Sequence, residues 1–254
     1  MADRKAHDSS AALDAEGGEA DSARPEAHAT RDNTPVPMPA LPVPMTARGE
    51  ATRRRILDAA EGVFGEVGYY EASISEITHR AGVAQGTFYI YFHTKRDAFV
   101  ELIEDIGNRL RAATSAAIAG TPDRIEAERR GFAAFLRFVA AHRQIYRIVE
   151  EANRVAPEAA REYYRRISQG YQRGLRAAMA SGEIQPNDAE ALAAALMGIG
   201  HFVALRWLIW PATLGATAPG ADETGEASSS PPEVPEAVFA AVMEFIARGL
   251  GTPR

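Results

Sequence analysis

Residues 73–92 read SISEITHRAGVAQGTFYIYF, and this stretch decides the fold. Ser73 stands three residues before Glu76, a spacing at which each side chain can satisfy a backbone N–H of the first helical turn. Two isoleucines and an alanine then recur at helical spacing. Gly82 follows, and glycine readily adopts the left-handed conformation that turns a chain sharply. The pattern predicts two short helices joined by a tight turn.

The second helix of this stretch carries an unusual load of polar side chains. Phe88 and Phe92 lie four residues apart and are expected to point inward, while Val83 fills the gap between the two helices. The residues left on the outer faces are Gln85, Thr87, Tyr89 and Tyr91. Such a pair of helices is typical of a helix-turn-helix, whose second helix enters the major groove of DNA. Glutamine can pair there with adenine, threonine can contact a thymine methyl, and tyrosine can reach phosphates.

Helices are also expected on both sides of this motif. Three arginines at 53–55 open a helix with an apolar face upstream. Downstream, Thr94 and Asp97 repeat the capping spacing and begin a long helix over residues 95–119. Lys95 falls in the first turn of that helix, where free N–H groups and the helix dipole favour a phosphate. The flanks therefore extend the predicted DNA-binding unit.

Roughly residues 48–108 resemble the DNA-binding domain of the tetracycline-repressor (TetR) family. The resemblance is carried, in register, by Ala81-Gly82-Val83, by the run from Gly86 to Phe92, and by Lys95-Arg96-Asp97. It implies an all-helical homodimer that binds a palindromic operator in double-stranded DNA and releases it when a small molecule enters the C-terminal domain. The DNA-contacting positions that it implies are Ser73, Ser75, Ala84, Gln85, Gly86, Thr87, Tyr89, Tyr91 and Lys95.

The overall charge is unusual for a protein that binds DNA. The 254-residue chain has a net charge of −6, with 46% hydrophobic and 24% charged residues. Residues 1–45 hold four basic against eight acidic side chains, and residues 46–96 hold seven against six. Charges beyond a Debye length of about 8–10 Å are screened, so attraction to DNA must depend on where the cations lie. The absence of cysteine excludes disulfides and thiolate metal sites.

The chain divides into three parts by composition and pattern. Residues 1–45 are rich in Ala, Asp, Glu, Ser and Pro without any period, which predicts a disordered tail. This tail is either solvated without a specific role or an arm that tunes binding to DNA or a partner. The DNA-binding domain is expected over 46–108, with its helix-turn-helix at 73–92. Residues 109–254 are expected to form a ligand-binding and dimerisation domain with a flexible insertion at 212–234.

The predicted fold class is all-α, with an N-terminal three-helix domain and a C-terminal helical bundle. Beyond the long helix, helical patterns cover residues 122–141, 142–156, 157–180 and 187–210, and a last helix begins after Pro235. The two last helices are apolar on nearly every side, which indicates that they pair with a second copy in a four-helix interface. Residues 189–210 could span a membrane by length alone. Charged side chains interrupt them, so a buried dimer helix is preferred, in a cytoplasmic protein.

Motifs for catalysis are missing from the sequence. The six histidines show no metal-ligand spacing such as H-x-x-x-H, and neither a glycine-rich phosphate loop nor a G-x-S-x-G elbow is present. The sequence therefore predicts no enzyme activity, no metal and no cofactor.

Aromatic and polar residues inside the apolar C-terminal helices are candidates for an effector site. They are Tyr146, Glu150, Tyr163, Tyr164, Tyr171, His201, Arg206 and Trp207. The alternative is that the aromatic residues fill a core or an interface. For Arg206 the alternative is a salt bridge across the dimer, and Glu150 or Glu244 could supply a carboxylate. The pattern from Glu150 to Trp207 resembles relatives thought to sense fatty acids or acyl-coenzyme A thioesters, which implies an acyl effector.

The favoured function is a transcriptional repressor that a small molecule releases from its operator. Two other DNA-binding functions stay open: a regulator without an effector, and an activator. An enzyme or small-molecule carrier that merely includes a helical bundle is the third class, and an intact recognition helix argues against it.

Overall fold

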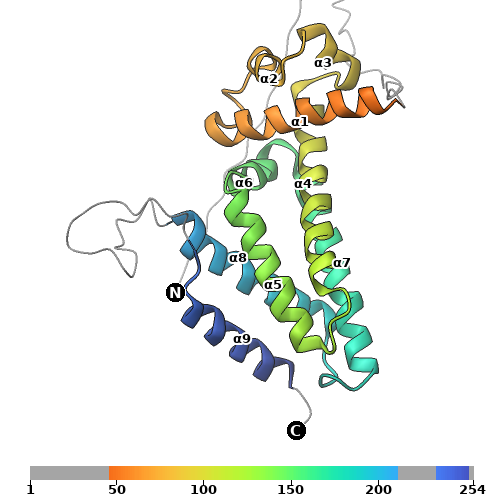
Figure 1. Cartoon of the computed structure of the whole chain (residues 1–254), viewed down its shortest axis with the longest axis vertical. Coiled ribbons are helices and arrows are strands. Elements are labelled where there is room, and N and C mark those ends of the chain that lie inside the picture. Colours follow the sequence, from red (N-terminus) through yellow and green to blue (C-terminus); the bar gives the residue numbers. More distant parts are fainter. Residues whose placement is uncertain (1–45, 211–232, 252–254) are drawn as a thin grey trace, which may run out of the picture. The chain divides into compact units, whose positions relative to one another are not determined.

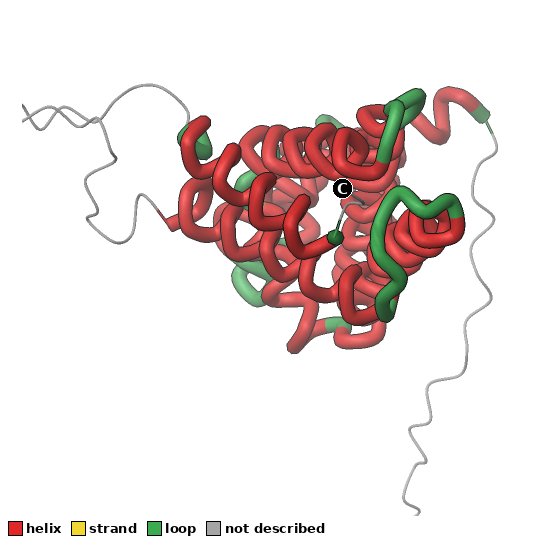
Figure 2. The backbone as a smooth tube through the Cα atoms, turned by 90° about the horizontal axis from the view of Figure 1, so that it is seen from below, coloured by secondary structure: helices red, strands yellow, loops and turns green. Residues whose placement is uncertain are grey.

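A computed structural model describes residues 46–210 and 233–251 of the chain. The expected tail at 1–45 and most of the expected insertion at 212–234 lie outside the described residues. Within these two ranges the chain is all-helical, without a strand (Figure 2). The elements are α1 (Ala47–Val67), α2 (Ile74–Ala81), α3 (Gln85–Tyr91), α4 (Lys95–Ile118), α5 (Arg124–Ala141), α6 (Ile145–Val155), α7 (Pro157–Ala180), α8 (Ala189–Ala204), a π-helical turn η1 (Leu205–Ile209) and α9 (Glu236–Leu250).

Side-chain caps begin the helices of the N-terminal domain. The Ser73 hydroxyl accepts a hydrogen bond from the Glu76 N–H at 3.1 Å. The Glu76 carboxylate accepts instead from Arg80, at 2.7 Å, so only half of the expected capping box forms at α2. At α4 both halves form: the Asp97 N–H donates to the Thr94 hydroxyl, and the Thr94 N–H donates to the Asp97 carboxylate. The capping signal thus predicted both helix starts correctly.

The core of the N-terminal domain extends past the expected domain boundary at residue 108. Phe88 and Phe92 are buried in it, as expected, together with Phe64 of α1 and Phe99 of α4. The same core also takes in apolar side chains of α6 and of the first turn of α7, among them Ile148. The three DNA-proximal helices therefore share their interior with a helix of the second domain.

The second core lies between α5, α7, α8 and α9. Figure 1 shows α4 beginning next to α1 and α3 and running alongside α5 and α7. Because α4 contributes to the first core and packs against α5 and α7, it is a continuous rod between the two parts.

Two expected helices differ in the structure. Residues 142–144 are a turn, and α6 begins only at Ile145, because His142 ends α5 by donating its N–H to the Phe138 and Val139 carbonyls. The expected continuous helix over 187–210 ends as an α-helix at Ala204 and continues as the π turn.

The α8 segment is long and apolar enough to cross a membrane by length and composition, over Ala189–Ile209. A third of its most apolar stretch is buried inside the protein, and several of its side chains belong to the second core. The rest of that stretch is at least partly exposed in the single chain, including Phe202.

Gly82 tests the turn between α2 and α3. Its φ is +63°, in the left-handed region, and a Cβ placed there would meet no atom within 4 Å. The cost of a side chain is therefore conformational rather than steric. We expect Gly82→Val to lower the free energy of unfolding by about 1–2 kcal/mol. Gly82→Asn should cost clearly less, because asparagine tolerates this conformation. Equal losses in urea unfolding would contradict this explanation.

Candidate nucleic-acid interface and ligand cavity

The outer face of α3 is formed by small and polar residues. Gln85 and Gly86 are exposed, and Tyr89 is 46% exposed. Ala84 is exposed at the N-cap position of the helix. Thr87 and Tyr91 are half-buried on the flank, and Tyr91 packs against the first core. The structure thus brings the expected groove-facing residues onto one surface with two of them at its edge.

Ile90 lies on the same surface and was missed by the sequence pattern. Its side chain is 50% exposed, although an isoleucine next to inward-facing phenylalanines suggests core. The sequence does contain a signal for this position. Ile90 is two residues from Phe88 and two from Phe92, and at about 100° per residue it must face away from both. One turn before it stands Gly86, where a Cβ would have open space. Ile90 therefore projects beside a bare stretch of backbone.

Ser73 and Ser75 are exposed at the start of α2. The Ser73 hydroxyl oxygen already accepts the capping hydrogen bond, and its hydrogen remains available to a phosphate. The two serines lie at the start of a helix, where N–H groups and the dipole favour an anion.

Lys95 has a different position from the one expected. Its ammonium donates to the backbone carbonyls of Tyr69 at 2.7 Å, Ala72 at 2.8 Å and Tyr70 at 3.2 Å. It also lies over the Tyr69 ring, 4.6 Å from the centroid. All three ammonium hydrogens have acceptors in the turn between α1 and α2. In the structure Lys95 therefore holds the turn together, and its contact with a phosphate stays a prediction.

Most other cations of the N-terminal domain are bound within the protein. The ion pairs are Arg53–Glu101, Arg54–Asp105, Arg80–Glu66 and Arg96–Glu158. Hydrogen bonds to Asp105 raise the pKa of the Arg54 guanidinium further above its usual value. Among the described residues 46–96, only Arg48 and Arg55 have a guanidinium without a carboxylate or carbonyl partner, and both are exposed on α1. These two cations are the best placed to attract phosphates.

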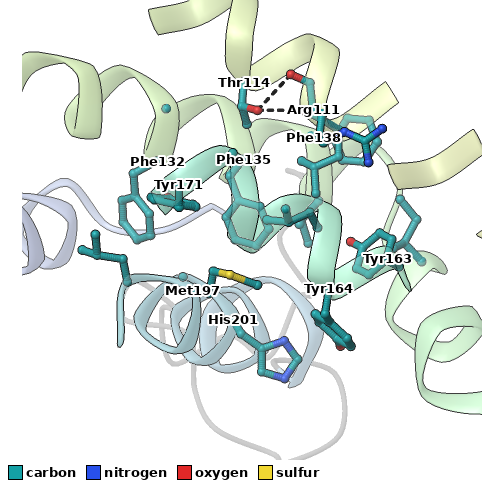
Figure 3. Close-up of a pocket in the computed structure, with 18 of the residues that line it drawn as sticks. Arg111, Thr114, Phe132, Phe135, Phe138, Tyr163, Tyr164, Tyr171, Met197 and His201 are labelled. Carbon is teal, nitrogen blue, oxygen red and sulfur yellow. Dashed lines mark hydrogen bonds between the residues drawn. The ribbon is translucent and has the colours of Figure 1, made fainter. Parts of the chain in front are cut away.

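The second domain contains a cavity of about 860 Å³. Side chains of α4, α5, α6, α7 and α8 line it (Figure 3). The expected effector residues found in its wall are Tyr146, Glu150, Tyr163, Tyr164, Tyr171 and His201. Arg206 and Trp207 are outside this wall. The Arg206 guanidinium is exposed on η1 in the single chain, 5.4 Å from the centre of the Trp207 ring, and its salt bridge across a dimer stays a prediction.

The cavity wall combines aromatic and aliphatic side chains with hydrogen-bonding groups, and it also includes charged side chains: Arg111, Arg124, Glu128, Arg147, Glu150 and Arg173. Burial raises the pKa of the Tyr146, Tyr163 and Tyr171 phenols, which keeps them protonated. Tyr146 stacks on His201 with ring centres 5.1 Å apart. Desolvation lowers the pKa of the His201 imidazole, which favours its neutral form. Such a wall suits a largely apolar ligand with a few polar atoms.

A buried ion pair in the same wall was missed by the sequence analysis. Arg124 and Glu128 form it one turn apart on α5, and their side chains are 11% and 4% exposed. Gly174 on α7 leaves room for the Arg124 guanidinium. Desolvation raises the pKa of the Glu128 carboxyl, against the opposing effect of Arg124. The signal in the sequence is the spacing of four between Glu128 and the inward-facing Phe132, which places the glutamate on the apolar side.

No group of three or more His, Asp or Glu side chains in the described ranges could hold a metal ion.

Comparison with known proteins agrees with this geometry. Residues 56–102 match the family described as bacterial regulatory proteins, tetR family. The chain is 41% identical over 70 residues to the uncharacterized HTH-type transcriptional regulator YdgC of Bacillus subtilis, covering 28% of this chain and 36% of YdgC. It is 43% identical over 51 residues to the fatty acid metabolism regulator protein of the same organism, covering 20% and 26%.

Solved structures extend the likeness to the fold of both domains. FadR, the fatty acid degradation regulator of Bacillus halodurans, has a TM-score of 0.62 at 21% identity, covering 80% of this chain and 97% of FadR. FadR of Bacillus subtilis in complex with stearoyl-CoA has a TM-score of 0.59 at 19% identity, covering 77% and 98%.

These matches identify the class. The chain carries the DNA-binding domain of the TetR family, and its relatives are transcriptional regulators of that family rather than enzymes. The aligned segments span only about a third of the first curated relatives, so the shared sequence is that of the DNA-binding domain.

A substitution of Lys95 distinguishes its role in the turn from the predicted phosphate contact. Lys95→Met leaves three carbonyls of the α1–α2 turn without their donor, which should lower the free energy of unfolding by about 1–3 kcal/mol. The matched control is Arg55→Met, which removes an exposed cation of α1 and should leave stability unchanged. The alternative result is that Lys95→Met unfolds like the wild type and only reduces the slope of log DNA affinity against log salt by about one. This result would show that Lys95 contacts a phosphate.

Proposed function

We propose that this protein is a sequence-specific transcriptional repressor that binds a palindromic operator as a homodimer and is released from it by a small, largely apolar effector. The observation that carries this proposal is the outer face of α3 on a TetR-family helix-turn-helix. Its amide, hydroxyl and methyl groups match the donors, acceptors and methyl groups of the major groove.

The charge distribution supports sequence-specific contacts with bases as the main source of DNA affinity, rather than non-specific attraction to phosphates. Only Arg48 and Arg55 are free cations in the described N-terminal domain. Each phosphate neutralised contributes about −0.9 to the slope of log affinity against log salt, so few free cations mean a shallow salt dependence. Specific binding must then come from Gln85, Tyr89 and Ile90 at the bases, with backbone N–H groups at phosphates.

A homodimer through α8 and α9 is supported by their exposed apolar side chains. Phe202 on α8 is 64% exposed, and Phe245 on α9 is 67% exposed. Around them the exposed positions of both helices are largely alanine and glycine, which allow close helix packing. Two large exposed aromatic side chains on helices that share the second core indicate that a partner covers them. The same partner would cover the apolar helix that could otherwise suit a membrane, as expected of a cytoplasmic regulator.

An acyl effector is supported by the cavity and by the relatives. A volume of about 860 Å³ accommodates a ligand with a long hydrocarbon part, and much of the wall is aromatic or aliphatic. One similar relative is a fatty acid metabolism regulator, and one structure of similar fold holds stearoyl-CoA. A fatty acid or an acyl-coenzyme A is therefore the first effector to test.

Activation is the second candidate function. The transcriptional activator FasR of Mycolicibacterium smegmatis is 30% identical to this chain over 99 residues, which cover 39% of this chain and 45% of FasR. The position of the operator relative to a promoter decides between the two functions, and reporter expression in the presence and absence of the protein measures it.

Selection of bound duplexes from random DNA tests the proposal. We expect an inverted repeat whose half-sites lie about 34 Å apart or a multiple of it, with binding by an even number of protomers. Stearoyl-coenzyme A added to the selected complex should then lower operator affinity, and operator should lower the affinity for the ligand by the same factor. If the selection enriches no sequence, the proposal is overturned. If it enriches an operator but stearoyl-coenzyme A does not change the affinity, the protein is a DNA-binding regulator that does not respond to this effector.

Ile90 gives a test at the level of single methyl groups. We expect one thymine of each half-site to pack its methyl against Ile90, so its replacement by uracil should weaken wild-type binding by roughly fourfold, about 0.8 kcal/mol. Ile90→Ala should remove this discrimination, whereas Val67→Ala, a control at an exposed valine of α1, should retain it. Equal thymine preference in wild type and Ile90→Ala would show that Ile90 does not read the base.

A further inference from the structure

The turn between α1 and α2 is held by two side chains of α6. The Glu151 carboxylate accepts the Tyr69 N–H at 2.6 Å. The Arg147 guanidinium donates to the Glu66 carbonyl at 2.6 Å and more weakly to the Gly65 carbonyl at 3.4 Å. Arg147 therefore satisfies carbonyls at the C-terminal end of α1, and Glu151 satisfies the first N–H of the turn beyond it.

A glycine near the end of α1 and the glycine that directly follows this helix make the close approach possible. A Cβ at Gly68 would lie 2.5 Å from a Glu151 carboxylate oxygen and 2.8 Å from an Arg147 nitrogen, and the φ of Gly68 is +84°. A Cβ at Gly65 would collide with the side chain of Gln144, at the start of α6. The end of α1 is thus shaped to receive the side chains of α6.

The turn is held from its other side by α4. Lys95 binds the carbonyls of Tyr69, Tyr70 and Ala72, as described above. Tyr69 therefore has its N–H bound to α6 and its carbonyl bound to α4. Directly after the turn, Ser73 caps α2, and α3 follows. The placement of the recognition helix depends on this turn.

The opposite face of α6 belongs to the cavity. Tyr146, Glu150 and Asn153 line it, and Arg147 also belongs to its wall. The helix has only 11 residues, so one rigid element touches both the ligand space and the turn. The side chains of Arg147 and Glu151 are 46% and 13% exposed, which places the pair between solvent and protein.

We propose that Arg147 and Glu151 are positioning residues that fix the recognition helix on the second domain by gripping the α1–α2 turn, and that they set which half-site spacing the dimer accepts. The inference rests on the proposed function as a dimeric operator-binding protein. It goes beyond that function by assigning spacing selectivity to two side chains that touch neither DNA nor the other protomer's recognition helix.

The physical reason lies in the second binding step of a dimer. Once one recognition helix is bound, the other binds its half-site at an effective concentration that depends on how well its position is defined. A rigid link favours one spacing strongly. A loosened link broadens the distribution of positions of the second recognition helix. The operator with the best spacing is then bound more weakly, and the difference in affinity between it and operators with other spacings becomes smaller.

The test measures binding to the selected operator, to versions with one or two base pairs added or removed at the centre, and to an isolated half-site. Glu151→Leu and Arg147→Met should each reduce the preference for the best spacing over the altered ones by about tenfold. Affinity for the half-site should stay as in the wild type. Glu151→Gln retains an acceptor oxygen for the Tyr69 N–H and should restore most of the preference.

A matched pair on α5 serves as the control. Glu126 and Arg130 have the same spacing of four and a hydrogen bond of 2.7 Å, and they belong to the second domain away from the turn. Glu126→Leu and Arg130→Met should keep the wild-type spacing preference. Urea unfolding confirms that all variants are folded.

Two results overturn the inference. One is a wild-type spacing preference in both Glu151→Leu and Arg147→Met. The other is an equal loss of half-site and full-operator binding, which would mean that the pair only supports folding of the helix-turn-helix. If the wild-type protein selects no duplex at all, the proposed function itself fails, and this outcome is distinct from the other two.

Discussion

The arrangement of the helices depends on hydrogen bonds to the backbone N–H and C=O groups of the non-helical turn between α1 and α2. Lys95 of α4 and Glu151 of α6 supply its hydrogen-bond partners. Below the turn, the apolar core is shared as well, since Phe99 of α4 and Ile148 of α6 pack with Phe64 of α1. Movement of α1–α3 relative to the rest of the chain would break both the polar contacts and this core.

Because α4 and α6 contribute both to the first core and to the cavity wall, they connect the cavity physically with the DNA-binding face. The last α4 residue of the first core is Ile106, and the part of α4 that lines the cavity begins one turn later, at Leu110. Helix α6 both lines the cavity and holds the turn. A ligand that prefers one arrangement of these helices can only shift the equilibrium by its difference in affinity between the two arrangements. The short path between the sites means that small displacements of α6 suffice.

The sequence predicted the helix-turn-helix well because its signals are local. Cap spacing at Thr94, the glycine at 82 and the inward pair Phe88 and Phe92 each act within a few residues. The TetR resemblance rests on the same residues and was confirmed by the comparisons. Ile90 could also have been found, because its angular position on α3 opposes the two phenylalanines.

The contacts of Lys95 and Glu151 could not be predicted in this way. Their partners lie 23 or more residues away, and no periodicity reports a hydrogen bond to a distant backbone group. The start of α6 was misplaced for a related reason: His142 contacts Glu61, which is 81 residues earlier, and the chain turns there. Arg206 was expected in the effector site, but it lies on the exposed side of the π turn and outside the cavity wall. Tertiary contacts decide these positions.

The most direct measurement is a methylation-protection footprint of guanine N7 atoms on the selected operator, which reports occupancy of the major groove. The account predicts two symmetric protected patches, separated by about one helical turn or a multiple of it, at low salt and without added ligand. A single patch, or no protected guanine at saturating protein, would contradict a dimer that reads successive major grooves.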